Sequence, residues 1–507
     1  MTPPRPAFRP CVRTALTLAI VMLAGCAVGP DFVRPTPEAP EDWQAWRSAD
    51  PALVQAGVDA GLPRGAWWLA YNDPTLDALQ QRARDASPDL QTAVLHLAQA
   101  RVQRGTVASQ QLPEVGLSAS VSRQRQSEYG ASIRLLDAIG GDNRDALVEV
   151  LSQPFNLYQA GLGVSWELDL WGRVRRSVEA ADADVERQAA LLDQTGLALG
   201  GEVARAYFEL RTTQRKIALT RDDIAALQQR LDLLDARVRA GTLDHLDLQR
   251  QRAELEAQQA RLPQLQAQEG ASRNQIALLL GERPGALDAE LGAPAAASAD
   301  TPSTLPALAL GVPSDIARRR PDLRAAEAKL HNATANVGVA TADLYPSIRL
   351  GGQFGYESYL SGEFGSWGSR VWSIGPSLDL PIFDHGRRRG VVQLRELQQQ
   401  EAAIAYHQAV LKAWQEIDDA LSGYTALQQQ ADHLQAREAS AGDAYQLAQA
   451  KYDGGIADYT AVLDSQRAWL QSRSDLADAQ GRLAVQYATV NLALGNVPPA
   501  LADSAVP

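Results

Sequence analysis

The chain has 507 residues, a formal net charge of −12, and acidic and basic side chains mixed along its length. Because the basic residues form no long patch, this composition argues against nucleic acid as a partner. After the first 25 residues no segment approaches 18 uninterrupted apolar residues, so no transmembrane helix is expected there.

The first 25 residues have the features of an export signal. Three arginines, Arg5, Arg9 and Arg13, precede an apolar run, residues 15–24, that is too short to span a bilayer. The run ends in Leu-Ala-Gly-Cys, which resembles the lipobox of bacterial lipoproteins. We therefore expect a signal peptide over residues 1–25 and acyl chains on Cys26, the alternative being an ordinary signal peptide with an incidental cysteine.

The mature chain offers no thiol chemistry beyond this anchor. The only other cysteine, Cys11, lies in the signal, so no disulfide is expected, and loss of the signal's three arginines takes the net charge to −15. Ala27 stands where an aspartate would often signal retention at the inner membrane. We therefore expect an outer-membrane protein, lipid-anchored on the periplasmic side, with no cofactor other than the acyl chains of Cys26.

The rest of the chain is a tandem duplication. Residues 87–113 align without a gap with residues 320–346, and residues 172–284 align in the same way with residues 386–498. We expect an extended N-terminal segment over 26–72, a first repeat over 73–284, a linker rich in Ala, Pro and Ser over 285–306, a second repeat over 307–498, and a tail over 499–507.

Each repeat has the pattern helix, two strands, very long helix, turn and helix. The first helix begins near Asp73 or Ser87, and the long helix runs from residue 172 to about residue 240 with a heptad seam, as in a coiled coil. Its roughly 69 residues would reach about 100 Å at ~1.5 Å per residue. Pro263 lies in the returning helix of the first repeat and predicts a kink that the second repeat lacks.

Four segments alternate apolar and polar residues: 113–121, 157–170, 347–358 and 371–383. Their length and alternation match a transmembrane barrel, the alternative being an antiparallel sheet packed on a soluble core. Four strands cannot close a barrel, so a membrane barrel must be shared between subunits. The fold class is therefore mainly α with a membrane β-barrel portion, in which four strands per chain and a homotrimer give 12 strands.

Four sequence blocks resemble the outer-membrane factor family, the TolC-like ducts, and in particular its NodT/OprM-like lipoprotein branch that serves resistance-nodulation-division efflux systems. The blocks are residues 25–35, 67–79, 166–181 and 311–350. The resemblance implies a homotrimer that spans the outer membrane as a barrel and continues as a helical tunnel through the periplasm. It also implies a periplasmic membrane-fusion adaptor and an inner-membrane resistance-nodulation-division transporter as partners.

In this family the turns after the long helices form a periplasmic tip that is closed at rest. Here those turns contain Gly241 and Asp244 in the first repeat, and Gly454, Gly455 and Asp458 in the second. The glycines permit the chain to reverse direction.

The segment after the second turn resembles the family's periplasmic gate. The resemblance implies gate roles for Asp464, Arg467 and Thr460, although Ala461 stands where some members have a second acidic residue. Three symmetry-related carboxylates at a narrow axis would attract cations. The alternative is that Asp464 is a solvated helix residue that pairs with Arg467 three positions on.

Two arginine clusters follow strands at helix starts, where the helix dipole disfavours positive charge. The first contains Arg173, Arg175 and Arg176, and the second contains Arg387, Arg388 and Arg389. These candidate membrane-interface clusters would bind anionic headgroups or carboxylates of a neighbouring subunit, or they are simply solvated.

No catalytic motif and no metal-binding spacing of histidine, cysteine or carboxylate is present, so neither an enzyme nor a metal site is expected. The favoured function is a passive outer-membrane duct that exports small toxic compounds such as antibiotics, dyes or phenolics, gated at its tip. A duct for type I protein secretion and a non-transporting structural lipoprotein are the alternatives. A general diffusion porin is disfavoured because it needs no long coiled coils.

Overall fold

The fold is described from a computed structural model, in which residues 27–36, 65–130, 134, 143–242, 244–292 and 319–497 are described. Cys26 and the signal peptide lie outside these residues, as do most of the expected linker and the tail. The described residues form two compact units. The strand unit takes its residues from Met1–Val33, Ala100–Asp184 and Leu330–Ala402, and the helical unit from Arg34–Gln99, Val185–Lys329 and Ala403–Pro507.

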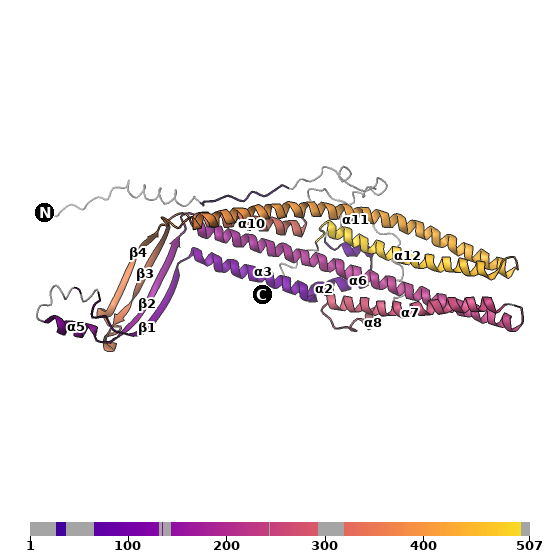
Figure 1. Cartoon of the computed structure of the whole chain (residues 1–507), viewed down its shortest axis with the longest axis horizontal. Coiled ribbons are helices and arrows are strands. Elements are labelled where there is room, and N and C mark those ends of the chain that lie inside the picture. Colours follow the sequence, from indigo (N-terminus) through magenta and orange to yellow (C-terminus); the bar gives the residue numbers. More distant parts are fainter. Residues whose placement is uncertain are drawn as a thin grey trace, which may run out of the picture. The chain divides into compact units, whose positions relative to one another are not determined.

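Helices account for most elements (Figure 1). In chain order the first repeat contains η2 (Trp67–Tyr71), α2 (Pro74–Ala86), α3 (Pro88–Ala108), η3 (Ser109–Gln111), β1 (Glu114–Gln124), α5 (Arg144–Ser152), β2 (Phe155–Leu168), α6 (Arg173–Arg239), α7 (His245–Leu279) and α8 (Asp288–Leu291). The second contains α10 (Pro321–Ala342), β3 (Ser347–Ser358), η5 (Ser361–Glu363), η6 (Trp367–Ser369), β4 (Arg370–Asp379), α11 (Arg387–Asp453) and α12 (Tyr459–Ala493).

Two long helical hairpins, α6–α7 and α11–α12, have helices of the same lengths. Helices α6 and α11 each contain 67 residues, and α7 and α12 each contain 35. The start residues Arg173 and Arg387 are a pair in the gap-free alignment of the sequence. The predicted internal similarity is therefore also a similarity of helix lengths and turn positions.

The helix ends follow from local sequence. Asp73 caps α2 by accepting hydrogen bonds from the backbone amides of Thr75 and Leu76, and Pro88 and Pro321 are the first residues of α3 and α10. Asp73 and Ser87 therefore mark two successive helices, not alternative starts of one.

The structure bears on two expectations about the helices, the kink at Pro263 and the linker after residue 284. Helix α7 runs without interruption through Pro263, and the kink expected there stays a prediction. The short helix α8 lies inside the segment expected to be a linker, because Leu287 and Leu291 are buried in the main core and hold the chain against it.

None of the helices in the described residues combines the length and the apolar composition needed to cross a membrane.

The four strands form one antiparallel sheet with the order β1-β2-β3-β4 (Figure 1). One row across all four strands is Leu117, Leu162, Phe354 and Trp372, and the adjacent row is Gly116, Gly163, Gln353 and Ser373. Because side chains alternate between faces, one face is apolar and the other is polar or bare. The apolar side chains are exposed, as Leu117 (76%) and Ile374 (81%) illustrate.

Two further features of the sheet are its edges and the close approach of its two central strands. Strands β1 and β4 are edges, each paired to one neighbour within the described residues. At the centre, Gly355 lies opposite Gly161, and a Cβ on Gly355 would lie 2.4 Å from the carbonyl oxygen of Ala160. The close approach of β2 and β3 therefore requires glycine at position 355.

The helical unit has one large core. Trp67, Trp68 and Tyr71 of η2 are buried against aromatic residues of the long hairpins, including Phe208 and Tyr487. The Tyr71 hydroxyl donates a 2.7 Å hydrogen bond to the carbonyl of Ala484, which satisfies its buried polar atom. The segment before α2 is thus part of the core that holds the hairpins together.

Candidate functional site

The turn between α6 and α7 is a Schellman motif followed by a helix cap. Gly241 has φ = 73°, and the amide of Thr242 donates a 3.0 Å hydrogen bond to the carbonyl of Arg237. The Asp244 carboxylate then accepts a 3.2 Å hydrogen bond from the amide of Leu246 and caps α7. Both predicted residues of this turn therefore have definite backbone roles.

The turn between α11 and α12 repeats this geometry. Gly455 has φ = 72°, and the amide of Ile456 donates a 2.8 Å hydrogen bond to the carbonyl of Lys451. The Asp458 carboxylate accepts a 3.1 Å hydrogen bond from the amide of Ala461. Gly454, grouped with these residues by sequence, is not among the positive-φ glycines, so the reversal does not depend on it.

The two turns lie together in the helical unit (Figure 1). Five buried side chains, which we call the turn cluster, connect them: Leu234, Leu248, Tyr459, Val462 and Leu463. The Tyr459 hydroxyl donates a buried 2.7 Å hydrogen bond to the side-chain oxygen of Gln251. Burial raises the pKa of this hydroxyl, so it stays protonated and serves as a donor.

Two further polar contacts join the hairpins beside the turn cluster. Arg467 Nε donates a 2.6 Å hydrogen bond to Glu254, whose side chain is only 9% exposed. Arg250 donates a 2.9 Å hydrogen bond to the Thr460 hydroxyl. The predicted residues Arg467 and Thr460 are thus both bound to α7, each through a partner that the sequence did not single out.

Asp464 differs from its two predicted neighbours. Its side chain is exposed, and within the described residues it has no ion-pair partner. The alternative pairing of Asp464 with Arg467 is not present, because Arg467 binds Glu254 instead. Asp464 is therefore an exposed carboxylate next to the polar contacts that join α7 and α12.

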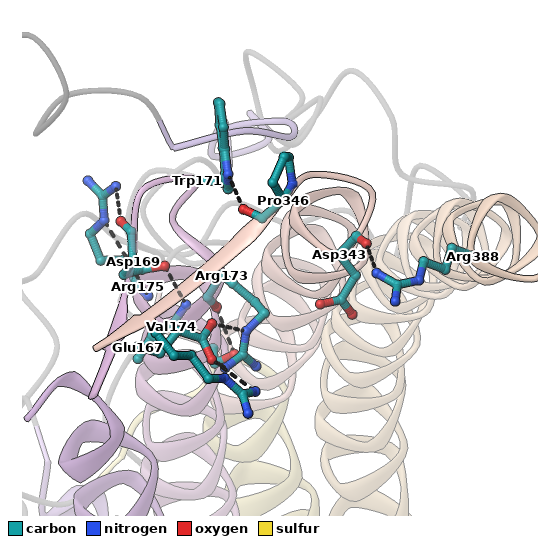
Figure 2. Close-up of polar contacts among 11 residues, drawn as sticks. Glu167, Asp169, Trp171, Arg173, Val174, Arg175, Asp343, Pro346 and Arg388 are labelled. Atoms are coloured by element: carbon teal, nitrogen blue, oxygen red, sulfur yellow. Dashed lines mark hydrogen bonds and ion pairs between the residues drawn. The ribbon is translucent and has the colours of Figure 1, made fainter. Parts of the chain in front are cut away.

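The first arginine cluster pairs within the chain. Arg173 donates two hydrogen bonds to Glu167, at 2.8 and 3.0 Å, and Arg175 donates one to Asp169 at 3.3 Å; these residues are drawn in Figure 2. The hydrogen bond to Glu167 raises the pKa of Arg173. Asp169 also caps α6, and these carboxylates offset the dipole cost of arginines at a helix start.

Arg176 holds the described N-terminal segment. It is 5% exposed and donates hydrogen bonds to the carboxylates of Asp31 (2.6 Å) and Glu179 (2.8 Å). The amide of Val28 donates a 3.0 Å hydrogen bond to the carbonyl of Trp171. The residue that follows Cys26 in the chain therefore begins a segment docked at the start of α6.

The second arginine cluster is different. Arg388 donates a hydrogen bond to the carbonyl of Asp343 (Figure 2) and lies 3.6 Å from the Asp384 carboxylate. Arg387 and Arg389 are exposed, and neither has an ion-pair partner among the residues that the structure describes. The two clusters, similar in sequence, are therefore unlike in structure.

Some residues of this site could not be predicted from the sequence. Glu254, Gln251 and Arg250 lie in a helix of mixed polar composition, where no motif distinguishes them from solvated neighbours. Glu167 and Asp169 could have been found, because acidic residues alternate at the end of β2 just before the arginines. No group of three or more potential metal ligands lies together in the described ranges.

Comparison with known proteins gives consistent matches over nearly the whole chain. The family described as "Outer membrane efflux protein" matches residues 79–282 and 312–496. The chain is 30% identical over 479 residues to the pyoverdine export outer membrane protein OpmQ of Pseudomonas putida, covering 94% of this chain and 95% of that protein. It is 31% identical over 486 residues to the outer membrane protein OprJ of Pseudomonas aeruginosa, covering 96% and 95% respectively.

A solved structure shares the fold. The outer-membrane channel OprN matches with a TM-score of 0.81 and 32% sequence identity, covering 93% of this chain and 99% of that chain. The predicted fold class, mainly helical with a few antiparallel strands, is therefore confirmed as that of an outer-membrane channel.

Proposed function

Because the chain belongs to the outer membrane efflux protein family, we propose that it is the outer-membrane channel of a tripartite pump and passively conducts small toxic compounds out of the cell. The sheet carries this proposal. Within the described residues it has one exposed apolar face, one polar face and two open edges, as a barrel segment needs if lipid lies outside and water inside.

The open edges of the sheet support assembly as a homotrimer. A bilayer leaves no edge unpaired, so β1 of one copy would pair with β4 of the next. Three copies would supply twelve strands, enough for an open lumen, whereas two would supply eight, whose side chains nearly fill the interior. The long hairpins then meet a periplasmic adaptor and an inner-membrane resistance-nodulation-division transporter.

We further propose that the contacts between the hairpins form the gate. The turn cluster, the Tyr459–Gln251 hydrogen bond and the Arg467–Glu254 ion pair hold the two turns of one chain together. In a trimer three Asp464 carboxylates would face one axis and attract cations. Opening would separate the turns and break these contacts.

Lipidation at Cys26 is the remaining part of the proposal. It is supported by Ala27, which lies against Gly172 in the strand unit, close to the end of β2 where a membrane surface would be. The intact mass of the mature protein tests it: we expect a chain that starts at Cys26 and carries acyl groups. An unmodified mass would show that Cys26 carries no acyl chains and would contradict the lipid anchor.

The experiment that tests the function is dye accumulation in the organism that encodes the protein. Deleting the gene is expected to raise intracellular ethidium several-fold, and the wild-type gene should reverse this. A gene with a stop codon at Trp67, at matched transcript level, is the control. Unchanged accumulation of dyes and of antibiotics in the deletion strain would argue against drug efflux and favour protein secretion.

A further inference from the structure

The outward apolar stripe of β4 does not stop where the strand stops. Trp372, Ile374 and Leu378 are exposed on one face of β4, which ends at Asp379. The same alternation continues with Leu380 (51% exposed) and Ile382 (90%). Phe383 follows and is 79% exposed, so large apolar side chains leave the sheet and point into the surroundings of the strand unit.

Two exposed arginines follow this apolar segment, separated from it by Asp384, His385 and Gly386. Arg387 and Arg389 start α11, and both are exposed without an ion-pair partner in the described part of the chain. Asp384 does not neutralise them. Its carboxylate accepts hydrogen bonds from the amides of Gly386 and Arg388 and pairs with the Arg388 side chain.

At the corresponding junction of the first repeat, between β2 and α6, the arginines are paired within the chain. Arg173 and Arg175 occupy the positions of Arg387 and Arg389 in the gap-free alignment, and they pair with Glu167 and Asp169. Extending that alignment backwards without a gap places Pro381 opposite Glu167, and Phe383 opposite Asp169. The second repeat therefore has apolar residues where the first has the carboxylates that bind its arginines.

Apolar side chains followed by unpaired cations match the boundary between hydrocarbon and headgroups. Exposed Ile and Phe gain free energy on leaving water for acyl chains. A guanidinium binds phosphate through two parallel hydrogen bonds and is attracted by anionic lipid. The order along the chain, apolar and then basic, is the order in which a strand leaving the membrane meets these two layers.

We propose that Leu380, Ile382 and Phe383, together with Arg387 and Arg389, form a binding surface for anionic phospholipid. Acyl chains lie on the three apolar side chains, and each arginine binds a phosphate on its own side of the start of α11, because residues two apart on a helix do not face each other. The proposal requires only that the sheet is inserted in a membrane and is independent of what the channel exports. A carboxylate of a neighbouring subunit is the competing partner for the arginines, and it would leave the apolar segment unexplained.

Native mass spectrometry of the full-length protein tests the site. The protein is released from nanodiscs that contain phosphatidylcholine with a fraction of phosphatidylglycerol, and the retained lipids are counted. The wild type should retain phosphatidylglycerol preferentially, and rising salt should weaken this preference. Arg387→Gln and Arg389→Gln should each lower phosphatidylglycerol affinity about fivefold, and the double variant more, without changing retention of phosphatidylcholine.

Two further variants separate charge from packing. Arg395→Gln, on the same helix but bonded to Gln398, is the matched control and should retain lipid like the wild type. Ile382→Ser should weaken phosphatidylglycerol retention without any change in charge. Equal retention of both lipids by the wild type would overturn the proposal. So would a double variant that falls apart into monomers in phosphatidylcholine alone, because it would show that the arginines bind a neighbouring subunit.

Discussion

Glu254 is a nearly buried carboxylate whose one ion-pair partner in the described structure, Arg467, comes from the other hairpin. In the gate proposed above, such a contact would stabilise the closed arrangement of the turns and would be lost when they separate. The family resemblance singled out Arg467, and the only partner that the sequence suggested, as an alternative to the gate role of Asp464, was Asp464. The actual partner, Glu254, could not be found in this way, because an (i, i+3) pair is visible in sequence and a contact between helices is not.

Arg467→Ala is expected to favour the open channel. Removing the ion pair costs the closed state about 1 kcal/mol, since Arg467 is half exposed, and this corresponds to about a fivefold rise in open probability. Recordings in planar bilayers measure this directly. Arg437→Ala, which removes the exposed Arg437–Asp475 pair of the same unit, is the control and should change nothing.

A double-mutant cycle completes that test. If Arg467 and Glu254 act on each other, Glu254→Ala combined with Arg467→Ala should shift opening by less than the sum of the single shifts. Strict additivity of the two shifts would show that the ion pair does not contribute to closure.

Asp223 makes the stability of the helical unit depend on pH. Burial raises its pKa from 3.8 to about 6, although its 2.7 Å hydrogen bond from Arg473 opposes the shift. The folded state therefore binds this proton more tightly than the unfolded state, and the contribution is lost as the pH rises through about 6. Thermal melting should show that the free energy of unfolding of the wild type falls by about 1 kcal/mol between pH 5 and pH 7, relative to that of Asp223→Asn. An identical pH response of both proteins would contradict this.

At the scale of elements, the sequence predicted most of the fold because periodicity and turn residues are local signals. The hairpin lengths, the two glycine turns and strand β3 follow from the gap-free repeat and from alternation. Strands β1 and β2 differ from their expected ranges by up to three residues at an end, and the end of β4 differs most. Its apolar alternation reaches residue 383, yet the strand ends at Asp379, because Pro381 lacks an amide for a further ladder hydrogen bond.

The two glycines of the second turn provide a matched pair of substitutions. Gly455→Ala should destabilise the protein by about 1–2 kcal/mol, because alanine is strained at φ = 72° even though nothing lies within 4 Å of the new Cβ. Gly454→Ala should be close to neutral, since its φ is not positive and its Cβ would make ordinary contacts. Melting temperatures of the two variants test this. Equal losses would show that turn strain is not what Gly455 relieves.

At the scale of the whole molecule, the proposed barrel needs more than one chain. In the described residues the sheet has two open edges and an exposed apolar face, and the Asp464 carboxylate has no ion-pair partner. Sequence could predict the need for further copies, because four strands cannot close a barrel. It could not predict which arginine cluster would form ion pairs within the chain. That depends on how the end of β2 is placed against the start of α6.

The measurement that tests the central claim most directly is single-channel conductance of the purified protein in a planar bilayer, with wild type beside Asp464→Ala and Arg467→Ala. A gated trimeric channel predicts a small, mostly closed wild-type conductance, reduced cation preference when the Asp464 ring is removed, and more frequent opening in Arg467→Ala. A large constant conductance that neither substitution changes would contradict the gate. The absence of any conductance from well-folded trimers would contradict the channel itself.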